Sequence, residues 1–280
     1  MEWFTEPFAL GFQQRALLGG VLAAVMTSVV GTWLVLRGMS FFGDAFVHGV
    51  IPGIAAAVVL DLNPLVGAAI AAAVMVFAIE LVNRHTVLGE DTSIGLLFVG
   101  MLALGVAITS RLDSYTGSLT GILFGDALGV TTSDLVGQAI LTVIVASVAL
   151  ALYRPLLSLS FNAEKAELWS MKPKRAHAAL LVLIAIAVIG SFQSVGTLLV
   201  FGLLIGPPAT ASLIARTVPR MMLYSVIIGL FSVWLGLTLS YHLRTAGSAT
   251  MALVPIVLFF LVLAFTRLVH RPLPQEVAHA

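Results

Sequence analysis

Residues 64–82 read PLVGAAIAAAVMVFAIELV, an apolar run whose single charged side chain is that of Glu80. A helix needs about 20 predominantly apolar residues to cross the hydrocarbon core of a bilayer. Comparable runs recur at residues 17–36, 92–109, 134–153, 177–190, 195–214, 221–240 and 249–266, with a shorter candidate at 46–60. The sequence therefore predicts an all-α, polytopic membrane helical bundle with eight or nine transmembrane helices.

The composition supports this prediction and excludes several function classes. Hydrophobic residues make up 60% of the 280 residues and charged residues 10%, whereas soluble domains carry roughly 25% charged residues. The helices occupy most of residues 1–280, so we expect a single transmembrane domain with no soluble catalytic domain beside it. The chain has no cysteine for a thiolate metal site and no P-loop motif for a nucleotide. Its net charge of +1 gives no indication of a nucleic-acid partner.

Positive charge is densest at residues 154–175, and the positive-inside rule assigns this loop to the cytoplasm. Alternation then places loops 83–91 and 216–220 inside and loops 61–64, 111–133 and 241–247 outside. The amino terminus lies outside with nine spans and inside with eight. Within these loops we expect Asn162 to cap a short surface helix, and residues 111–133 to form an interfacial or re-entrant segment.

Residues 41–54, FFGDAFVHGVIPGI, place Asp44 and His48 four positions apart, hence on one face of a helix. A charged carboxylate near the bilayer centre costs at least about 2.5 to 3.5 kcal/mol, so such a pair indicates a functional site, usually an ion path. One carboxylate oxygen and one imidazole nitrogen suit a divalent first-row metal. The alternative is structural: Asp44 caps its helix and His48 hydrogen-bonds to a neighbouring helix.

The residues directly after the pair bear on the choice between these two interpretations. Gly49, Pro52 and Gly53 interrupt the helix directly behind the pair, as transporters do where backbone carbonyls face a substrate, which favours the metal-ligand hypothesis. Glu90 and Asp91, by contrast, are expected only to begin a helix.

The remaining polar residues of interest lie in the predicted outer loops. Asp126 lies at the outer mouth, where capping a turn is favoured over contact with an incoming cation. His242 and Arg244 could contact a partner, and we do not assign them to a metal.

Pro207 and Pro208 are predicted to break the helix that spans residues 195–214 at the cytoplasmic face. The small residues that follow would then form a brief separate helix before Arg216, a shape that a motor subunit could grip. The alternative is a kinked continuation of the same span.

Three passages of this sequence are similar to the permease subunits of ABC importers for zinc, manganese and iron. They are LRGMSFFGDAFVHGVIPGIA at 36–55, GEDTSIGLLFVGMLALGVAI at 89–108 with LFGDALGVT at 123–131, and SVGTLLVFGLLIGPPATA at 194–211. Two places depart from the family pattern: Asn162 stands where the family often has aspartate, and the turn TAGSAT at 245–250 matches only loosely.

The resemblance implies a type II importer permease, multi-pass in the lipid of a bacterial inner (cytoplasmic) membrane. It further implies a permease homodimer with a central pathway, two separate ABC ATPase subunits that hydrolyse the ATP, and an extracytoplasmic metal-binding protein. The chain itself would be no enzyme and hold no permanent cofactor, with Zn²⁺ or Mn²⁺ as the transported substrate. Asp44 and His48 would contact the metal. The residues that would dock the ATPase are Pro208, Ala209, Thr210, Ala211, Ser212, Leu213, Ile214, Ala215 and Arg216.

Several alternatives remain open from the sequence. A permease for a metal chelate, such as a siderophore or cobalamin, would share the architecture. A membrane metalloenzyme would need a third ligand and a base, and an ion-coupled carrier would need no ATPase. One Asp and one His do not distinguish zinc from manganese or iron.

Overall fold

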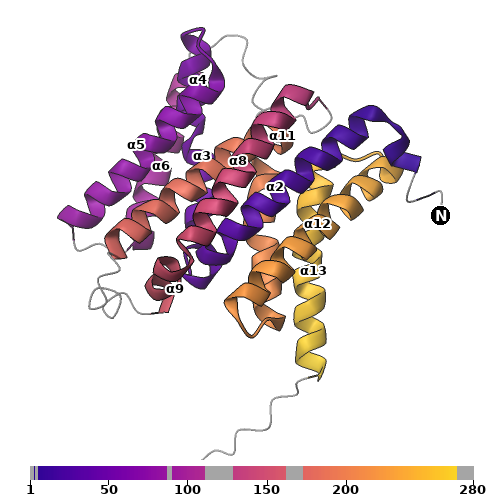
Figure 1. The fold of residues 1–280 in the computed structure, drawn as a ribbon. Helices are drawn as coiled ribbons and strands as arrows, with labels where there is room; N and C mark the ends of the chain where they lie inside the picture. The colour runs from indigo at the N-terminus through magenta and orange to yellow at the C-terminus, as the bar shows by residue number, and fades with distance from the viewer. Residues whose placement is uncertain (1–2, 4–5, 87–89, 111–128, 162–172, 270–280) are drawn as a thin grey trace, which may run out of the picture.

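The computed structural model describes residue 3 and residues 6–86, 90–110, 129–161 and 173–269, and this part of the chain contains helices and no strand. Figure 1 shows the helices packed side by side, with the yellow helix α13 extending away from the others at one end. The elements are η1 (Glu6–Ala9), α2 (Gly11–Leu36), α3 (Ser40–Gly49), α4 (Ile51–Val59), α5 (Pro64–His85), α6 (Glu90–Thr109), α8 (Thr132–Ala151), α9 (Tyr153–Phe161), α11 (Pro173–Ile214), α12 (Val218–Leu243) and α13 (Gly247–Val269).

Within the described ranges, eight helices are long and apolar enough to cross a membrane, and a shorter apolar helix covers Leu198–Ile214. Helices α3 and α4 together make one of the eight, Ser40–Val59. The 42 residues of α11 would span about 63 Å as a straight helix, about twice the hydrocarbon thickness. The backbone of Gly196, at φ 77° and ψ 165°, divides it into two spans. The predicted bundle of eight or nine transmembrane helices is confirmed.

The predicted helix break at Pro207 and Pro208 is wrong. Helix α11 continues through both prolines to Ile214, and its change of direction lies at Gly196 instead. Pro208 has no N–H to donate to the carbonyl of Leu204, and that carbonyl faces Gly31 of α2 so closely that a Cβ on Gly31 would collide with it. Because a neighbouring helix covers the freed carbonyl, the second span runs on, as the alternative prediction had it.

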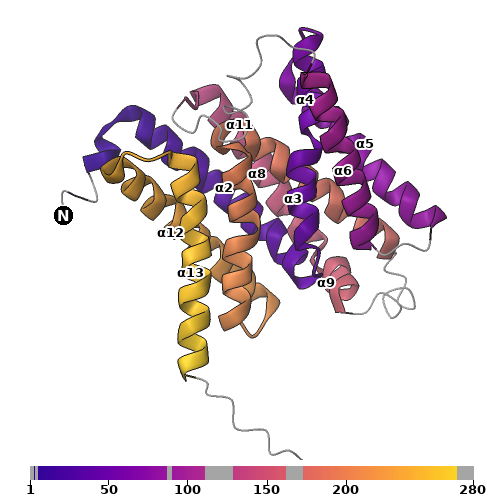
Figure 2. The same ribbon diagram turned by 180° about the vertical axis from the view of Figure 1, so that it is seen from behind.

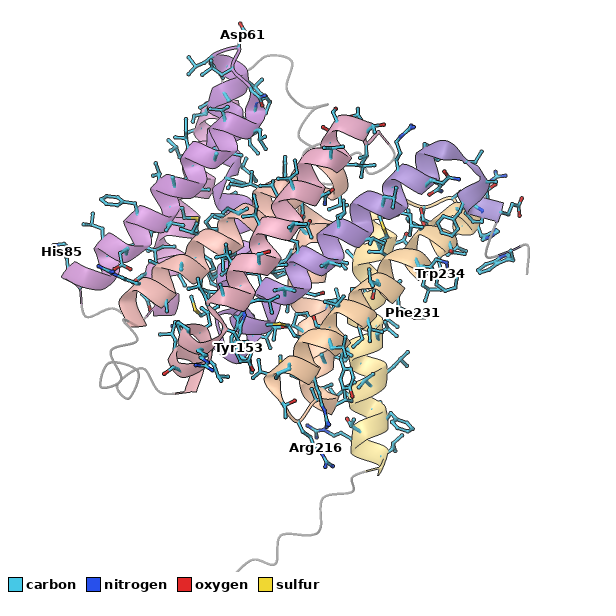
Figure 3. All side chains as sticks on the ribbon, in the orientation of Figure 1. Asp61, His85, Tyr153, Arg216, Phe231 and Trp234 are labelled. Carbon is cyan, nitrogen blue, oxygen red and sulfur yellow. The ribbon has the colours of Figure 1, made fainter. Side chains whose placement is uncertain are left out.

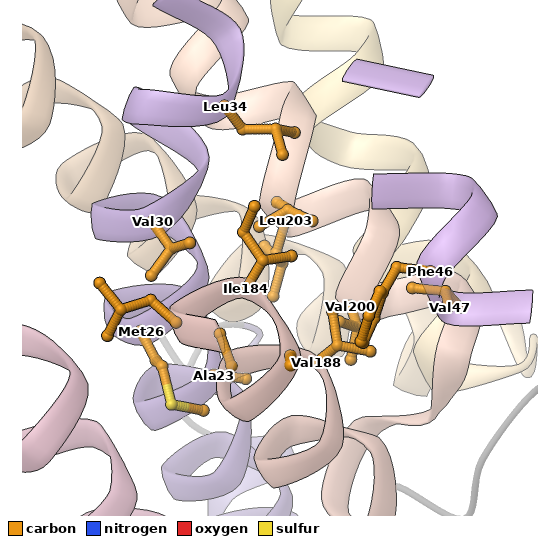
Figure 4. Close-up of a cluster of buried hydrophobic side chains, with 14 of the residues drawn as sticks. Ala23, Met26, Val30, Leu34, Phe46, Val47, Ile184, Val188, Val200 and Leu203 are labelled. Atoms are coloured by element: carbon orange, nitrogen blue, oxygen red, sulfur yellow. The ribbon is translucent and has the colours of Figure 1, made fainter. Parts of the chain in front are cut away.

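The core forms where α2 meets both halves of α11 and the buried face of α3. Figure 4 shows this cluster, which includes Ala23, Met26, Val30 and Leu34 from α2, Ile184 and Val188 from the first half of α11, Val200 and Leu203 from its second half, and Phe46 and Val47 from α3. In lipid, helices associate through close packing rather than a hydrophobic driving force. Gly53 of α4 and Gly67 of α5 serve this purpose, since a Cβ on either would meet the backbone of the other.

The contacts at the helix ends show which end faces the cytoplasm. Trp33, near the end of α2, packs edge-on against Tyr153 at the start of α9, with ring centroids 5.4 Å apart. This contact brings the α2–α3 turn next to Arg154. Figure 3 shows Tyr153 and Arg216 toward one end of the molecule and Asp61 at the other. The positive-inside rule then assigns the end with Arg154 and Arg216 to the cytoplasm, so α2 begins outside.

Other sequence predictions fall at helix ends. Helix α6 begins at Glu90, which confirms the helix-start interpretation of Glu90 and Asp91. Asn162, with its predicted surface helix, and Asp126, with most of the loop at 111–133, lie outside the described residues.

Candidate functional site

Helix α3 presents Asp44 and His48 together. The helix begins at Ser40, preceded by Met39 as the N-cap residue, so Asp44 lies in the second turn and does not cap the helix. Nε2 of His48 lies 3.5 Å from Oδ1 of Asp44, and both side chains are 32% exposed. The prediction that the two share one face is confirmed. The structural alternative is not supported, because neither residue hydrogen-bonds to another helix within the described ranges.

The geometry of this pair suits a shared ion. The 3.5 Å separation exceeds the roughly 2.7–2.9 Å of a strong charge-assisted hydrogen bond, so the two groups do not satisfy each other. Ligand atoms that each lie about 2.0–2.2 Å from a zinc ion can stand up to about 4 Å apart. An Asp oxygen and a His nitrogen at this spacing can therefore bind one divalent cation between them.

A hollow of about 360 Å³ opens beside the pair, between α3–α4 and α6. Its lining residues are Asp44, His48, Ile51, Phe98, Leu102, Gly105, Val106 and Thr109. Thr109 is the last residue of α6 and lies toward the outer end, where its hydroxyl donates to the carbonyl of Gly105 at 3.0 Å. The hollow thus extends from Asp44 and His48 along α6 toward its outer end, with mostly apolar walls.

The helix is interrupted directly behind the pair, as the sequence predicted. Helix α3 ends at Gly49 and α4 begins at Ile51. Pro52, in the first turn of α4, has no N–H to donate to the carbonyl of His48, four residues earlier. Because the span Ser40–Val59 begins at the cytoplasmic end, Asp44 lies in its cytoplasmic half and His48 lies close to its centre.

The opposite face of α3 is held by α11. A Cβ on Gly43 would lie 2.9 Å from Cδ2 of Leu204 and 3.8 Å from Cδ1 of Ile205, so the second half of α11 packs directly on α3. Figure 2 shows α3 between α6 and this half of α11. Packing on one side therefore leaves Asp44 and His48 facing the hollow on the other.

The residues predicted to dock an ATPase divide into two groups. They occupy the end of α11 and the short connection to α12. Pro208, Thr210 and Ala211 are buried, whereas Ser212, Ile214 and Arg216 are exposed. Only part of the predicted stretch is thus accessible in the single chain.

The two outer-loop residues singled out in the sequence lie apart from the hollow. His242 stacks on Trp3, with ring centroids 4.1 Å apart, and its Nε2 lies 2.8 Å from the Trp3 carbonyl oxygen. Arg244 ends α12 in the left-handed conformation, at φ 54°. Neither residue lines the hollow beside Asp44.

Sequence reasoning missed the contribution of α6. Phe98 and Thr109 line the hollow, and although Phe98 lies in the family-like passage at 89–108, no role was assigned to either residue. Across the described residues, no group of three or more His, Cys, Asp or Glu side chains is placed to hold a metal ion.

The described residues hold eight helices long enough to cross a membrane, a shorter apolar helix and an ionisable pair beside a hollow, which together indicate a membrane transport protein. The chain belongs to the ABC 3 transport family, whose model matches residues 9–266. It is an ABC metal-transport permease with the multi-pass fold that the sequence resemblance predicted.

Similar proteins cover nearly the whole chain. The manganese import system permease protein ScaB of Streptococcus parasanguinis is 36% identical over 250 residues, 89% of each chain. The manganese transport system membrane protein MntC of Listeria innocua is 34% identical over 255 residues, 91% of each chain. The chelated iron transport system membrane protein YfeD of Yersinia pestis is 29% identical over 264 residues, 94% of this chain and 89% of the relative.

Among solved structures, a chain of PsaBC from Streptococcus pneumoniae, in complex with Fab, superposes with a TM-score of 0.82 and 29% identity. The match covers 93% of this chain and 94% of that one.

Proposed function

We propose that this chain is the membrane-spanning subunit of an ATP-driven importer for a divalent transition metal in a bacterial cytoplasmic membrane, with manganese the first candidate and zinc the second. One observation carries the proposal: Asp44 and His48 stand one third exposed in a hydrophobic span, at the inner end of a hollow. Two ionisable groups in such a place are costly unless they serve an ion. The manganese systems named for ScaB and MntC support the choice of ion.

A second copy of the chain would complete the site. One Asp–His pair supplies two ligands, and no third His, Cys, Asp or Glu joins it among the described residues. A two-fold axis beside α3 would bring a second pair to the same ion and make four ligands. The ion path would then run along the axis of a permease homodimer.

Transport follows from the chemistry of these ligands. A metal ion delivered from outside by a binding protein exchanges part of its hydration shell for the Asp44 carboxylate and the neutral His48 imidazole. Few protein ligands and a loosened helix behind His48 keep the site weak enough to release the ion. ATP hydrolysis by two separate ATPase subunits, bound near Ser212, Ile214 and Arg216, then opens the inner side.

An importer of a metal chelate is the second candidate. The relative YfeD is named for chelated iron. A hollow of about 360 Å³ with mostly apolar walls also lies in the range of pockets for small organic molecules, about 300 to 1,000 Å³. In that case the chelate fills the hollow and Asp44 and His48 need not touch the metal.

The test is ATP hydrolysis and metal uptake by the reconstituted complex, with the binding protein loaded with manganese, with zinc or with nothing. We expect one loaded form to stimulate both activities, and Asp44→Ala and His48→Ala each to abolish the stimulation. Asp61→Asn and His85→Gln are matched controls, because both residues are exposed and neither lines the hollow. Stimulation that persists in both Asp44→Ala and His48→Ala would overturn the site assignment. An intact complex that neither metal-loaded binding protein stimulates would favour the chelate.

A further inference from the structure

We propose that Phe41 and Phe98 close the ion path on the cytoplasmic side of Asp44 and His48. The inference rests on the proposed function, since it takes the pair to lie on the path. The Phe98 ring contacts both neighbours: its centroid lies 6.1 Å from that of His48 and 5.9 Å from that of Phe41, which it meets edge to face at 81°. The two phenyl rings therefore continue the line of the site toward the cytoplasm.

The position of Phe41 fixes the direction of this closure. Phe41 precedes Asp44 by three residues on a helix that begins at the cytoplasmic end, so it lies about 4.5 Å nearer that side along the helix axis. Its ring reaches across to α6, where a Cβ on Gly95 would lie 3.8 Å from Cε1 of Phe41. Gly95 is one turn before Phe98, also toward the cytoplasm. The ring contact thus bridges α3 and α6 just inside the ligand pair.

The hollow stops at these rings. Its most cytoplasmic lining residues are Asp44 on α3 and Phe98 on α6, and Phe41 is not among the lining residues. Outward, the hollow extends along α6 as far as Thr109. On its cytoplasmic side the hollow therefore ends at the aromatic contact between Phe41 and Phe98.

Phenyl rings are suited to block a metal ion. A divalent cation that leaves Asp44 and His48 inward would meet apolar surface with no ligand to replace its lost water, which is unfavourable for a charge. Hydrophobic constrictions in channels stop ions in this way, by excluding water. Phe41 is 45% exposed on the same helix face as the ligand pair, so in the proposed dimer the rings of two copies would meet across the axis.

Helix α11 connects this closure to the proposed ATPase surface. The second half of α11 packs on α3 at Gly43, through Leu204 and Ile205, and ends with the exposed Ser212 and Ile214. A displacement of the end of α11 would press on α3 within two residues of Phe41. Separation of α3 from α6 would then part the two rings and open the inner side.

The experiment measures Mn²⁺ influx into proteoliposomes that contain the complete complex, with the loaded binding protein outside, in the presence and absence of internal ATP. We expect wild-type influx to require ATP. Phe41→Ala and Phe98→Leu should raise the ATP-independent influx by up to about tenfold, because they remove the ring contact that holds the path closed. Phe98→Leu keeps most of the side-chain volume, and Phe41 is partly exposed, so both variants should fold.

Phe77→Ala is the matched control, since Phe77 is 69% exposed on α5 and does not contact the site. Wild type without ATP-driven Mn²⁺ uptake would contradict the proposed manganese import itself. Normal uptake by the wild type, together with an ATP-independent influx through Phe41→Ala and Phe98→Leu no higher than through Phe77→Ala, would overturn the closure alone. An equal leak in all three variants would also overturn it, because the rings on the path would then have no special role.

Discussion

Replacing Gly31 by alanine tests the contact on which the second half of α11 depends. Gly31 lies in the last third of α2, and its Cβ position is occupied by the carbonyl oxygen of Leu204, with Cγ of Pro208 3.0 Å away. The obstacle is backbone, so no side chain can rotate out of the way. Gly31→Ala must therefore push α2 and α11 apart.

The size of the effect follows from two opposing terms. Overpacking a well-packed contact costs about 1 to 3 kcal/mol of the free energy of unfolding. Alanine in place of a mid-helix glycine returns roughly 0.5 to 1 kcal/mol through the unfolded chain. Gly137 of α8 has no atom within 4 Å of its Cβ position, so Gly137→Ala should show only the second term. The difference between the two variants is then the packing term alone.

Thermal unfolding of the purified protein, followed by tryptophan fluorescence, measures this difference. With about 2 to 4 °C of Tm per kcal/mol for a chain of this size, Gly31→Ala should unfold roughly 2 to 12 °C below Gly137→Ala. A Gly31→Ala variant as stable as Gly137→Ala would refute the close approach of α2 and α11.

A side-chain contact gives an internal control. At Gly43→Ala the closest atom is the flexible Cδ2 of Leu204, at 2.9 Å, and no backbone atom is among the nearest three. In the Leu204→Ala background, Gly43→Ala should therefore lower the free energy of unfolding by less than it does in the wild type. Gly31→Ala should lower it by as much as before, and a double-mutant cycle measures both effects.

Two further predictions concern the ends of the second span. Gly196→Ala should lower the free energy of unfolding by about 1 to 3 kcal/mol, because φ 77° with ψ 165° is a conformation that essentially only glycine adopts; the same Tm measurement, with Gly137→Ala as reference, checks it. Arg216→Glu should weaken co-purification of the ATPase subunit, whereas Arg267→Glu, an exposed arginine at the end of α13, should leave it unchanged; equal retention in both would remove Arg216 from the proposed docking surface.

Predictions from the sequence were reliable where the physical constraint is local. An apolar run of about 20 residues has few alternatives to a membrane-crossing helix, because lipid offers no partner for unpaired backbone groups. The spacing of Asp44 and His48 placed both on one face for the same kind of reason, since helical periodicity is a property of the chain itself.

The sequence misled where a neighbouring helix decides. Two consecutive prolines predict a helix end, yet α2 approaches so closely at Gly31 that the carbonyl freed by Pro208 is covered and the helix continues. The glycine that does redirect the chain, Gly196, has no local mark that separates it from the other glycines of α11.

The sequence alone therefore determined the class of fold and a number of crossings of eight or nine. It also identified Asp44 and His48, two ionisable side chains that are costly to place in a membrane. Only the tertiary structure decided what surrounds that pair: a hollow walled by α6, and the rings of Phe41 and Phe98 in contact although they lie on different helices. The physical reason is that periodicity orients side chains about their own helix axis, whereas the identity of the opposing helix depends on how closely backbones can approach in lipid.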